Sequence, residues 1–209
     1  MRTVIDTMCD EGSVLEIRRA FGPGMVTCLG RIEGKPLGIV ANNPTHLAGA
    51  IDSDGSDKAA RFLQLCDAFD LPVLFLCDTP GMMVGPEVEK TALVRHCSRL
   101  FVTGANLGVP FGTIVLRKAY GAGLYAMSGP GFRPNCTLAL PQAMIAVMGA
   151  EAAVNAVYAN KIAEKPEAER AARDAEEHRG ALAEALHRGL HEQHRHDRGR
   201  DAHEAERQP

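Results

Sequence analysis

The chain has 209 residues, a formal net charge of −3 and 45% hydrophobic residues, a composition that fits one globular domain or slightly more. The negative charge argues against a dedicated nucleic-acid binder, which usually carries a basic surplus. No apolar run approaches the roughly 20 residues that cross a bilayer, so we expect neither a nucleic-acid partner nor a membrane partner.

The composition changes near residue 163. From Glu164 onward there is no Val, Ile, Phe, Met, Tyr or Cys, and six of the eight histidines lie there. We therefore predict a folded body over 1–162 and a polar tail over 163–209, rich in Ala, Glu, Arg and His, that is helical or disordered. His187, His191 and His194 could share a helical face, but such tails bind metals adventitiously, and no metal is predicted. A truncated or frame-altered end would give the same abrupt change.

The six cysteines form no C-x-x-C pair, and most lie inside apolar segments. This pattern favours buried free thiols over a disulfide or metal framework. The N-terminus also lacks the long apolar core of a signal peptide. Both observations predict a cytoplasmic protein.

The first half of the body begins with a short amphipathic segment around Ile5, followed by a strand-like run over 14–17. Residues 25–32 and 37–41 read as a β-hairpin whose connection, 33–36, contains Gly and Pro. A helix should begin at Ser56 as its N-cap. Its apolar face is predicted to contain Ala60, Phe62, Leu63, Cys66 and Phe69.

The second half alternates strands and helices. A buried strand over 73–77 ends at Asp78-Thr79-Pro80-Gly81, and a helix is expected from near Glu87 to Ala105. The face of that helix should contain Leu93, Val94, Cys97, Leu100 and Phe101. A central strand over 112–116, two short apolar runs over 137–141 and 144–148, and a last helix over about 150–160 follow. The alternation predicts an α/β layer fold with ligands at the carboxyl ends of the strands.

The stretch Arg117–Met127 runs from a buried strand through Gly121-Ala122-Gly123 toward a helix expected over 124–127. Such a turn aims unpaired N–H groups at one point, and small side chains let a ligand atom approach, which suits a developing oxyanion. A tight turn without chemistry is the alternative.

Acid and base side chains are few in the body. Its only histidines are His46 and His96, and the cluster of Asp52, Asp54 and Asp57 resembles a solvated loop with a helix cap. Asp78 is expected to cap its turn, with metal or ligand binding as the alternative. This inventory favours oxyanion stabilisation with the base supplied by a cofactor or substrate.

A nucleotide hydrolase is a weaker alternative. Asp78-Thr79-Pro80-Gly81 has the D-x-x-G form of a GTPase motif, but the P-loop that should precede it is missing. The nearest candidate, 30–36, is one residue short and has Pro36 where the metal-binding hydroxyl should be. No G-x-S-x-G nucleophile motif occurs either.

Several motifs, in order, resemble the biotin-dependent acyl-CoA carboxyltransferases, namely the β subunits of propionyl- and acetyl-CoA carboxylases and their methylmalonyl-CoA relatives. They occupy residues 30–44, 50–62, 71–85, 117–121 and 145–151, and the resemblance covers about 3–160. It implies a crotonase-like (ClpP/crotonase) α/β fold, a spiral of ββα units. The chain resembles the C-terminal half of that family only.

The resemblance implies carboxyl transfer between carboxybiotin and the α-carbon of an acyl-CoA. Ala122 and Gly123 match the biotin-side oxyanion hole, and Gly121 shapes its turn. The implied substrate and biotin pocket comprises Asp78, Thr79, Pro80, Gly81, Tyr120, Leu124 and Tyr125. Biotin would be carried on a separate carrier domain, and this chain would bind no metal.

The implied partners are the acyl-CoA substrate, a biotin carboxyl carrier or biotin carboxylase subunit, and an N-terminal carboxyltransferase half, within a homo- or hetero-oligomer. Many members read Tyr-Gly-Gly-Ala-Tyr-Asp where this chain has Tyr120–Tyr125, so Leu124 and Tyr125 leave the acyl chain open. An inactive or truncated assembly module is one alternative. A stand-alone crotonase-type acyl-CoA enzyme is another, although no Glu lies in the short turns after the central strands to act as its acid/base.

Overall fold

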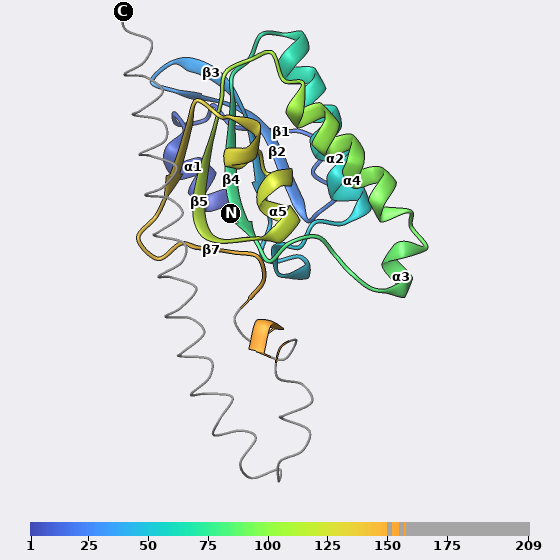
Figure 1. The fold of residues 1–209 in the computed structure, drawn as a ribbon. Coiled ribbons are helices and arrows are strands. Elements are labelled where there is room, and N and C mark those ends of the chain that lie inside the picture. The colour runs from blue at the N-terminus through green and yellow to red at the C-terminus, as the bar shows by residue number, and fades with distance from the viewer. Residues whose placement is uncertain (150–151, 155–156, 158–209) are drawn as a thin grey trace, which may run out of the picture. The chain divides into compact units, whose positions relative to one another are not determined.

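The computed structural model describes residues 1–149, 152–154 and 157 (Figure 1). One compact unit runs from Met1 to Val147. Of the helix expected over 150–160, residues 152–154 and 157 are described and are helical. The predicted boundary at 162 and the tail over 163–209, with its histidines, lie outside the described residues. Within the described ranges, no helix is both long enough and apolar enough to cross a membrane.

A mixed β-sheet organises this unit. Among the described residues it contains β1 (Leu15–Glu16), β2 (Met25–Ile32), β3 (Lys35–Asn42), β4 (Val73–Thr79), β5 (Phe111–Tyr120), β6 (Cys136–Ala139) and β7 (Met144–Ala146). The strand order is β1-β2-β3-β4-β5-β6, and β7 also pairs with β5. The first three strands are antiparallel, whereas β3, β4 and β5 are parallel, as are β6 and β7 with β5.

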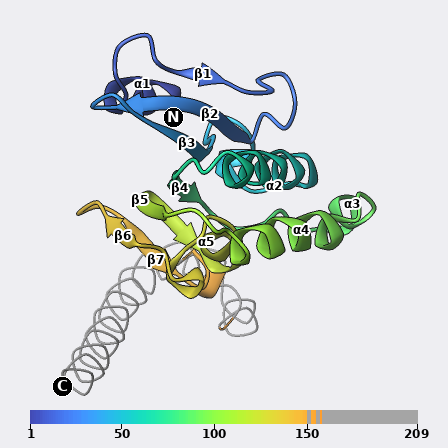
Figure 2. The ribbon, with the colours of Figure 1, turned by 90° about the horizontal axis from the view of Figure 1, so that it is seen from above.

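Helices cover the two faces of the sheet unequally. They are α1 (Arg2–Met8), α2 (Ser53–Ala68), α3 (Pro86–Glu89), α4 (Leu93–Ala105) and α5 (Gly121–Ala126), with short 3-10 turns at Leu47–Gly49 and Pro130–Phe132. Figure 2 shows α2 and α4 side by side on one side of the sheet, with α1 on the other. Successive residues of β4 face opposite sides of the sheet. Phe75 packs in the hydrophobic cluster that contains residues of α2, called the α2-side core, and Leu76 packs in the cluster that contains Ile5 of α1.

The predicted β-hairpin is present with a tighter turn than expected. Glu33 and Gly34 form a two-residue connection with φ values of 52° and 78°, and the Asp10 carboxylate accepts both of their N–H groups at 2.9 and 2.8 Å. Pro36 therefore lies inside β3. The strand tolerates it because the pairing with β4 begins only at Gly38, so the N–H that proline lacks is not needed there.

Helix α2 begins at Ser53, three residues before the expected N-cap Ser56, and its N-cap is Asp52, whose Oδ1 accepts the Gly55 N–H at 2.7 Å. The prediction of Ser56 as the N-cap was wrong, because Ser56 is buried inside the helix and its hydroxyl donates to the Asp52 carbonyl. The expected apolar face is buried except Phe69, which follows the last helical residue and is exposed. The acidic cluster thus contains a helix cap, as expected.

The helix predicted over 87–105 is divided into α3 and α4. Ala92 adopts a left-handed conformation at φ 55° between them. The Thr91 hydroxyl lies 2.6 Å from the Val88 carbonyl oxygen and 2.7 Å from Ser53 Oγ of α2, which holds the chain at the break. Val94 lies on the exposed side of α4, contrary to its predicted place on the apolar face.

Candidate active site

The loops after β3, β4 and β5 lie at one edge of the sheet, because these strands are parallel and their carboxyl ends meet there (Figure 1). Ile51 and Met82 form an isolated bridge between two of the loops. A Cβ atom built on Gly123 would lie 2.8 Å from both Gly81 Cα and Thr79 Cγ2. The sequence expectation that 78–81 and 121–123 share this edge agrees with the structure.

The strand-to-helix junction differs in detail from the expectation. Strand β5 continues through the cations to Tyr120, and α5 starts at Gly121, three residues before the expected start. Gly121 has φ 51°, and a Cβ there would lie 2.8 Å from the Val147 carbonyl oxygen. Both observations explain why glycine is required at the junction.

The Gly-Ala-Gly segment therefore forms the first turn of α5. N–H groups in the first turn of a helix precede the first i→i−4 hydrogen bond and lack an intrahelical acceptor. Within the described part of the chain, no side chain caps this helix from Tyr120. Ala122 is exposed and Gly123 is buried, so the turn presents backbone donors beside solvent.

Thr79 holds the turn after β4. Its Oγ1 accepts the Gly81 N–H at 3.1 Å and also lies 3.1 Å from the Gly81 carbonyl oxygen, to which it can donate. Pro80 is exposed at the tip. The expectation that Asp78 caps this turn was wrong, because its Oδ1 instead accepts from Arg117 Nε at 3.2 Å and from the Lys118 N–H at 3.3 Å.

Three predicted pocket residues flank the first turn of α5. Tyr120 is buried, with its hydroxyl 3.9 Å from Met144 Sδ, and burial raises the pKa of its phenol, so the phenol stays protonated at neutral pH. Leu124 is half-buried against the α2-side core, whereas Tyr125 is 53% exposed. Of these three side chains, Tyr125 is therefore the one available to a ligand.

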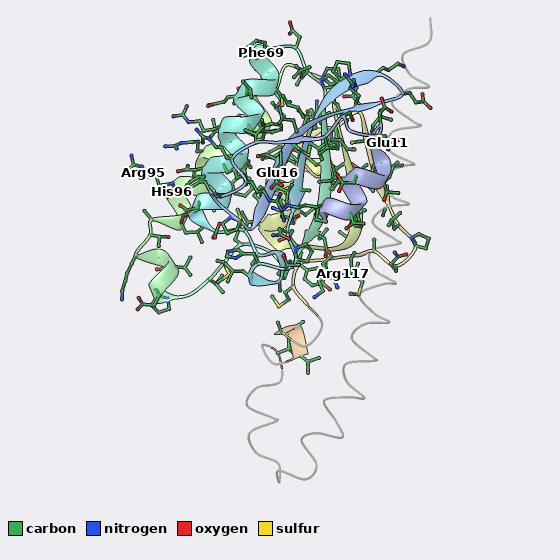
Figure 3. All side chains as sticks on the ribbon, turned by 180° about the vertical axis from the view of Figure 1, so that it is seen from behind. Glu11, Glu16, Phe69, Arg95, His96 and Arg117 are labelled. Atoms are coloured by element: carbon green, nitrogen blue, oxygen red, sulfur yellow. The ribbon has the colours of Figure 1, made fainter. Side chains whose placement is uncertain are left out.

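The two histidines of the body lie beside carboxylates at or near the start of α2. His46 Nε2 is 3.6 Å from Asp52 Oδ2, and His96 Nδ1 is 2.8 Å from Asp57 Oδ2. In Figure 3, His96 lies in the helix layer, away from Arg117 at the strand edge. Over the described residues, no group of three or more His, Cys, Asp or Glu side chains could hold a metal ion.

Sequence reasoning did not identify Asn42 as a residue of this edge. Its Oδ1 accepts the Asp78 N–H at 3.0 Å. Its Nδ2 is buried and finds no hydrogen-bond partner among the residues that the structure describes. A polar residue that ends an apolar strand was the available signal, since Asn42 closes β3 directly beside the end of β4.

Comparisons with known proteins give a consistent result. The model of the "Carboxyl transferase domain" family matches residues 1–205. The chain is 54% identical over 172 residues to a protein named "Uncharacterized carboxylase YngE" from Bacillus subtilis (strain 168), which covers 82% of this chain and 34% of that relative. It is 44% identical over 167 residues to the propionyl-CoA carboxylase beta chain of Saccharopolyspora erythraea, covering 80% of this chain and 31% of the relative.

A solved structure agrees with the sequence matches. The hexameric transcarboxylase 12S core, with methylmalonyl-coenzyme A and methylmalonic acid bound, superposes with a TM-score of 0.79 at 36% identity over 87% of this chain and 35% of that chain. The match confirms the crotonase-like α/β architecture predicted from the motifs. The chain spans about a third of the length of the curated relatives it matches.

Proposed function

Because this chain belongs to the carboxyl transferase domain family, we propose that it forms one part of an acyl-CoA carboxyltransferase and supplies the biotin-side oxyanion hole. The family resemblance inferred from the motifs is confirmed, and the family match extends beyond the expected residues 3–160. The proposed reaction moves a carboxyl group between carboxybiotin and the α-carbon of an acyl-CoA. The chain would act together with an N-terminal half and a biotinylated carrier in an oligomer.

One observation carries the proposal: the first turn of α5 places the N–H groups of Ala122 and Gly123 ahead of any intrahelical acceptor, beside an exposed surface. Donors that are fixed before the reaction stabilise developing negative charge without a cost for reorganising solvent. Gly123 lies close to the turn after β4, since a Cβ on it would be 2.8 Å from Gly81 Cα, so the donors are packed against that turn.

The residues at this edge can bind the oxygen of a urea carbonyl group, and biotin would be held through that oxygen. That oxygen needs hydrogen-bond donors rather than a charged partner, and this edge provides backbone N–H groups. Bound carboxybiotin supplies the carboxyl group and, after its loss, a nitrogen base. The backbone donors of this chain hold the ureido carbonyl oxygen, and the neutral Tyr120 phenol stays packed against Met144 of β7.

Acyl-chain recognition is proposed to involve the residues just after the donors. Tyr125 is exposed and a Cβ on Gly131 would lie 2.7 Å from its ring, so the ring lies over the loop that follows α5. Leu124 is partly buried and is a weaker candidate for contact with the acyl chain. Proteins related to this chain carry names with propionyl-CoA and methylmalonyl-CoA, and small acyl-CoA thioesters are the first substrates to test.

The test is carboxyl transfer in both directions between carboxybiotin and acyl-CoA, with and without a co-expressed N-terminal half. We expect activity in the assembly. Ala122→Pro, which removes one N–H donor at the second residue of α5, where that N–H makes no intrahelical hydrogen bond, should lower kcat on the order of 10²–10³-fold. Glu87→Pro is the matched control, because Glu87 occupies the same second helical position in the exposed helix α3.

Three results would contradict the proposal. An unchanged rate of carboxyl transfer in Ala122→Pro would show that this turn takes no part in the reaction. Binding to the other subunits without turnover would indicate an assembly module, and enoyl-CoA hydration by the isolated chain would indicate a stand-alone crotonase-type enzyme.

A further inference from the structure

Strand β5 changes its neighbours immediately before the proposed oxyanion hole. Up to Val115 it pairs with β6, and the Leu140 N–H still donates to the Val115 carbonyl at 3.0 Å. From Lys118 to Tyr120 it pairs with β7 instead. Residues 116 and 117 therefore lie between the two neighbours on this side of β5.

The same segment is irregular on its other side. Cys77 of β4 pairs with Val115 and Thr79 pairs with Ala119, so three residues of β5 lie opposite Asp78 alone. Such a bulge leaves peptide groups outside the regular ladder of hydrogen bonds. Buried peptide groups of this kind need other partners.

Side chains of β4 provide those partners. Asp78 Oδ1 accepts the Lys118 N–H at 3.3 Å, and Cys77 Sγ donates to the Lys118 carbonyl oxygen at 3.7 Å. Asp78 is itself held in place, since its backbone N–H donates to Asn42 Oδ1 of β3 at 3.0 Å. The Lys118 peptide is thereby fixed to the centre of the sheet.

This contact determines where the next residues lie. Lys118 is three residues before Gly121, and the intervening residues are strand backbone paired with β7. The side chain of Asp78 is 10% exposed, and its Oδ1 accepts from Arg117 and Lys118 of β5.

We propose that Asp78 is a positioning residue for the carboxyl-transfer site: by accepting the Lys118 N–H it fixes the bulge of β5 and so sets the position of the Ala122 and Gly123 donors. Its role in catalysis rests on the proposed function, whereas its role in fixing the strand end does not. Arg117 supports the carboxylate from outside, and its 52% exposed side chain makes it the more replaceable partner.

Three variants of the full chain separate the contributions. Asp78→Ala removes the acceptor, Asp78→Asn keeps an oxygen that can accept the Lys118 N–H, and Arg117→Gln removes only the guanidinium contact. Asp70→Asn is the matched control for the amide substitution, because Asp70 is exposed in the turn that follows α2. Amide hydrogen exchange over 116–123 reports the strand end directly, and kcat and KM for carboxyl transfer are measured in the assembly with wild-type partners.

We expect Asp78→Ala to speed exchange at Lys118 at least tenfold and to lower kcat roughly 10–100-fold with KM changed less than about threefold, since only the transition-state donors are displaced. Asp78→Asn should recover most of both effects, and Arg117→Gln should change each by less than Asp78→Ala does.

Unchanged exchange over 116–123 in Asp78→Ala would overturn the proposal. So would an Asp78→Asn variant as inactive as Asp78→Ala with a raised KM, because that result indicates direct contact between the carboxylate and a substrate. If Asp78→Ala does not fold, hydrogen exchange in the wild-type chain decides, because fast exchange of the Lys118 N–H would show that Asp78 does not fix it. If the wild-type assembly transfers no carboxyl group, the proposed function fails, and the exchange data alone decide whether Asp78 fixes the strand end.

Discussion

Two glycines in the first turn of α5 are required for different reasons. Gly121 has a positive φ and approaches the Val147 carbonyl, whereas Gly123 has ordinary dihedrals and is small because α5 packs tightly on the turn at Thr79 and Gly81. From the sequence, small size in this segment was interpreted as access for a ligand. In the structure, packing accounts for it at Gly123, and the exposed position is Ala122.

Gly123→Ala should destabilise the chain. The new Cβ would lie 2.8 Å from Gly81 Cα, so helix and turn must separate, and such overpacking costs about 1–3 kcal/mol in the free energy of unfolding. Urea denaturation monitored by circular dichroism measures the change. Gly108→Ala is the control, since its Cβ would meet only the end of the Asp67 side chain. Equal stability of the two variants would contradict the packing interpretation.

At the scale of elements, an ion pair links the first helix, α1, to the first strand, β1. Arg2 of α1 donates to both carboxylate oxygens of Glu16 in β1, at 2.9 and 2.7 Å. The hydrogen bond from Arg2 lowers the pKa of the Glu16 carboxyl below its usual value of 4.5. The same pair raises the pKa of Arg2, so both groups remain charged over the physiological range.

This pair predicts a pH dependence of stability. Because the folded pKa of Glu16 is depressed, its stabilisation is fully present above about pH 4.5 and is lost as the pH falls through the folded value. Arg2→Gln should cost about 1 kcal/mol at pH 7, a modest figure because the Arg2 side chain is 35% exposed and solvent screens the pair.

Urea titrations from pH 7 to pH 3 measure this dependence, with Arg31→Gln as the control at an exposed arginine. The difference in the free energy of unfolding between wild type and Arg2→Gln should become smaller as the pH falls toward 3. A difference that is constant with pH would show that the lost contribution is not electrostatic.

Local periodicity predicted the identity of most elements but not their ends. The apolar patterns located the hairpin, α2, β4 and β5 because burial of one face dictates them. The ends depend on hydrogen bonds that apolar periodicity does not encode. Asp52 rather than Ser56 caps α2 through a local bond from Gly55, and Thr91 contacts Ser53 across the fold where the helix over 87–105 breaks.

The candidate site shows the same difference between features that the local sequence predicts and features that it does not predict. Motif order placed 78–81 and 121–123 at one edge of the sheet, because those loops follow directly from the strands in the sequence. The hydrogen bonds of Asp78 with Lys118 and with Asn42 were missed, because each joins residues 36 or more positions apart. Spacing along the chain contains no information about such partners.

At the scale of the whole molecule, the thiols report how completely the body is folded. All six cysteines lie within the described residues and are free, and five of them are buried. Burial raises the pKa of Cys28 and Cys77 to about 12 and that of Cys66 to about 11, so these three are protonated near neutral pH. Cys136, on strand β6, is the exposed one. The expectation of buried free thiols holds for all but this residue.

A thiol reagent at pH 8 should therefore label one cysteine quickly in the native chain and all six after denaturation, since the thiolate is the reactive form. Mass spectrometry identifies the labelled residue, and Cys136→Ser should remove the fast reaction. Rapid labelling of two or more thiols in the native chain would indicate that part of the sheet is open.

The bulge in β5 limits how this strand can change length during evolution. It adds two residues opposite Asp78, an even number, so Val115 and Ala119 both remain in the α2-side core. A single insertion or deletion over 116–118 would move each of Ala119 and Tyr120 to the face of the sheet opposite to the one that it occupies now. Related chains should therefore differ in length here only by pairs of residues, even where every side chain in the segment has changed.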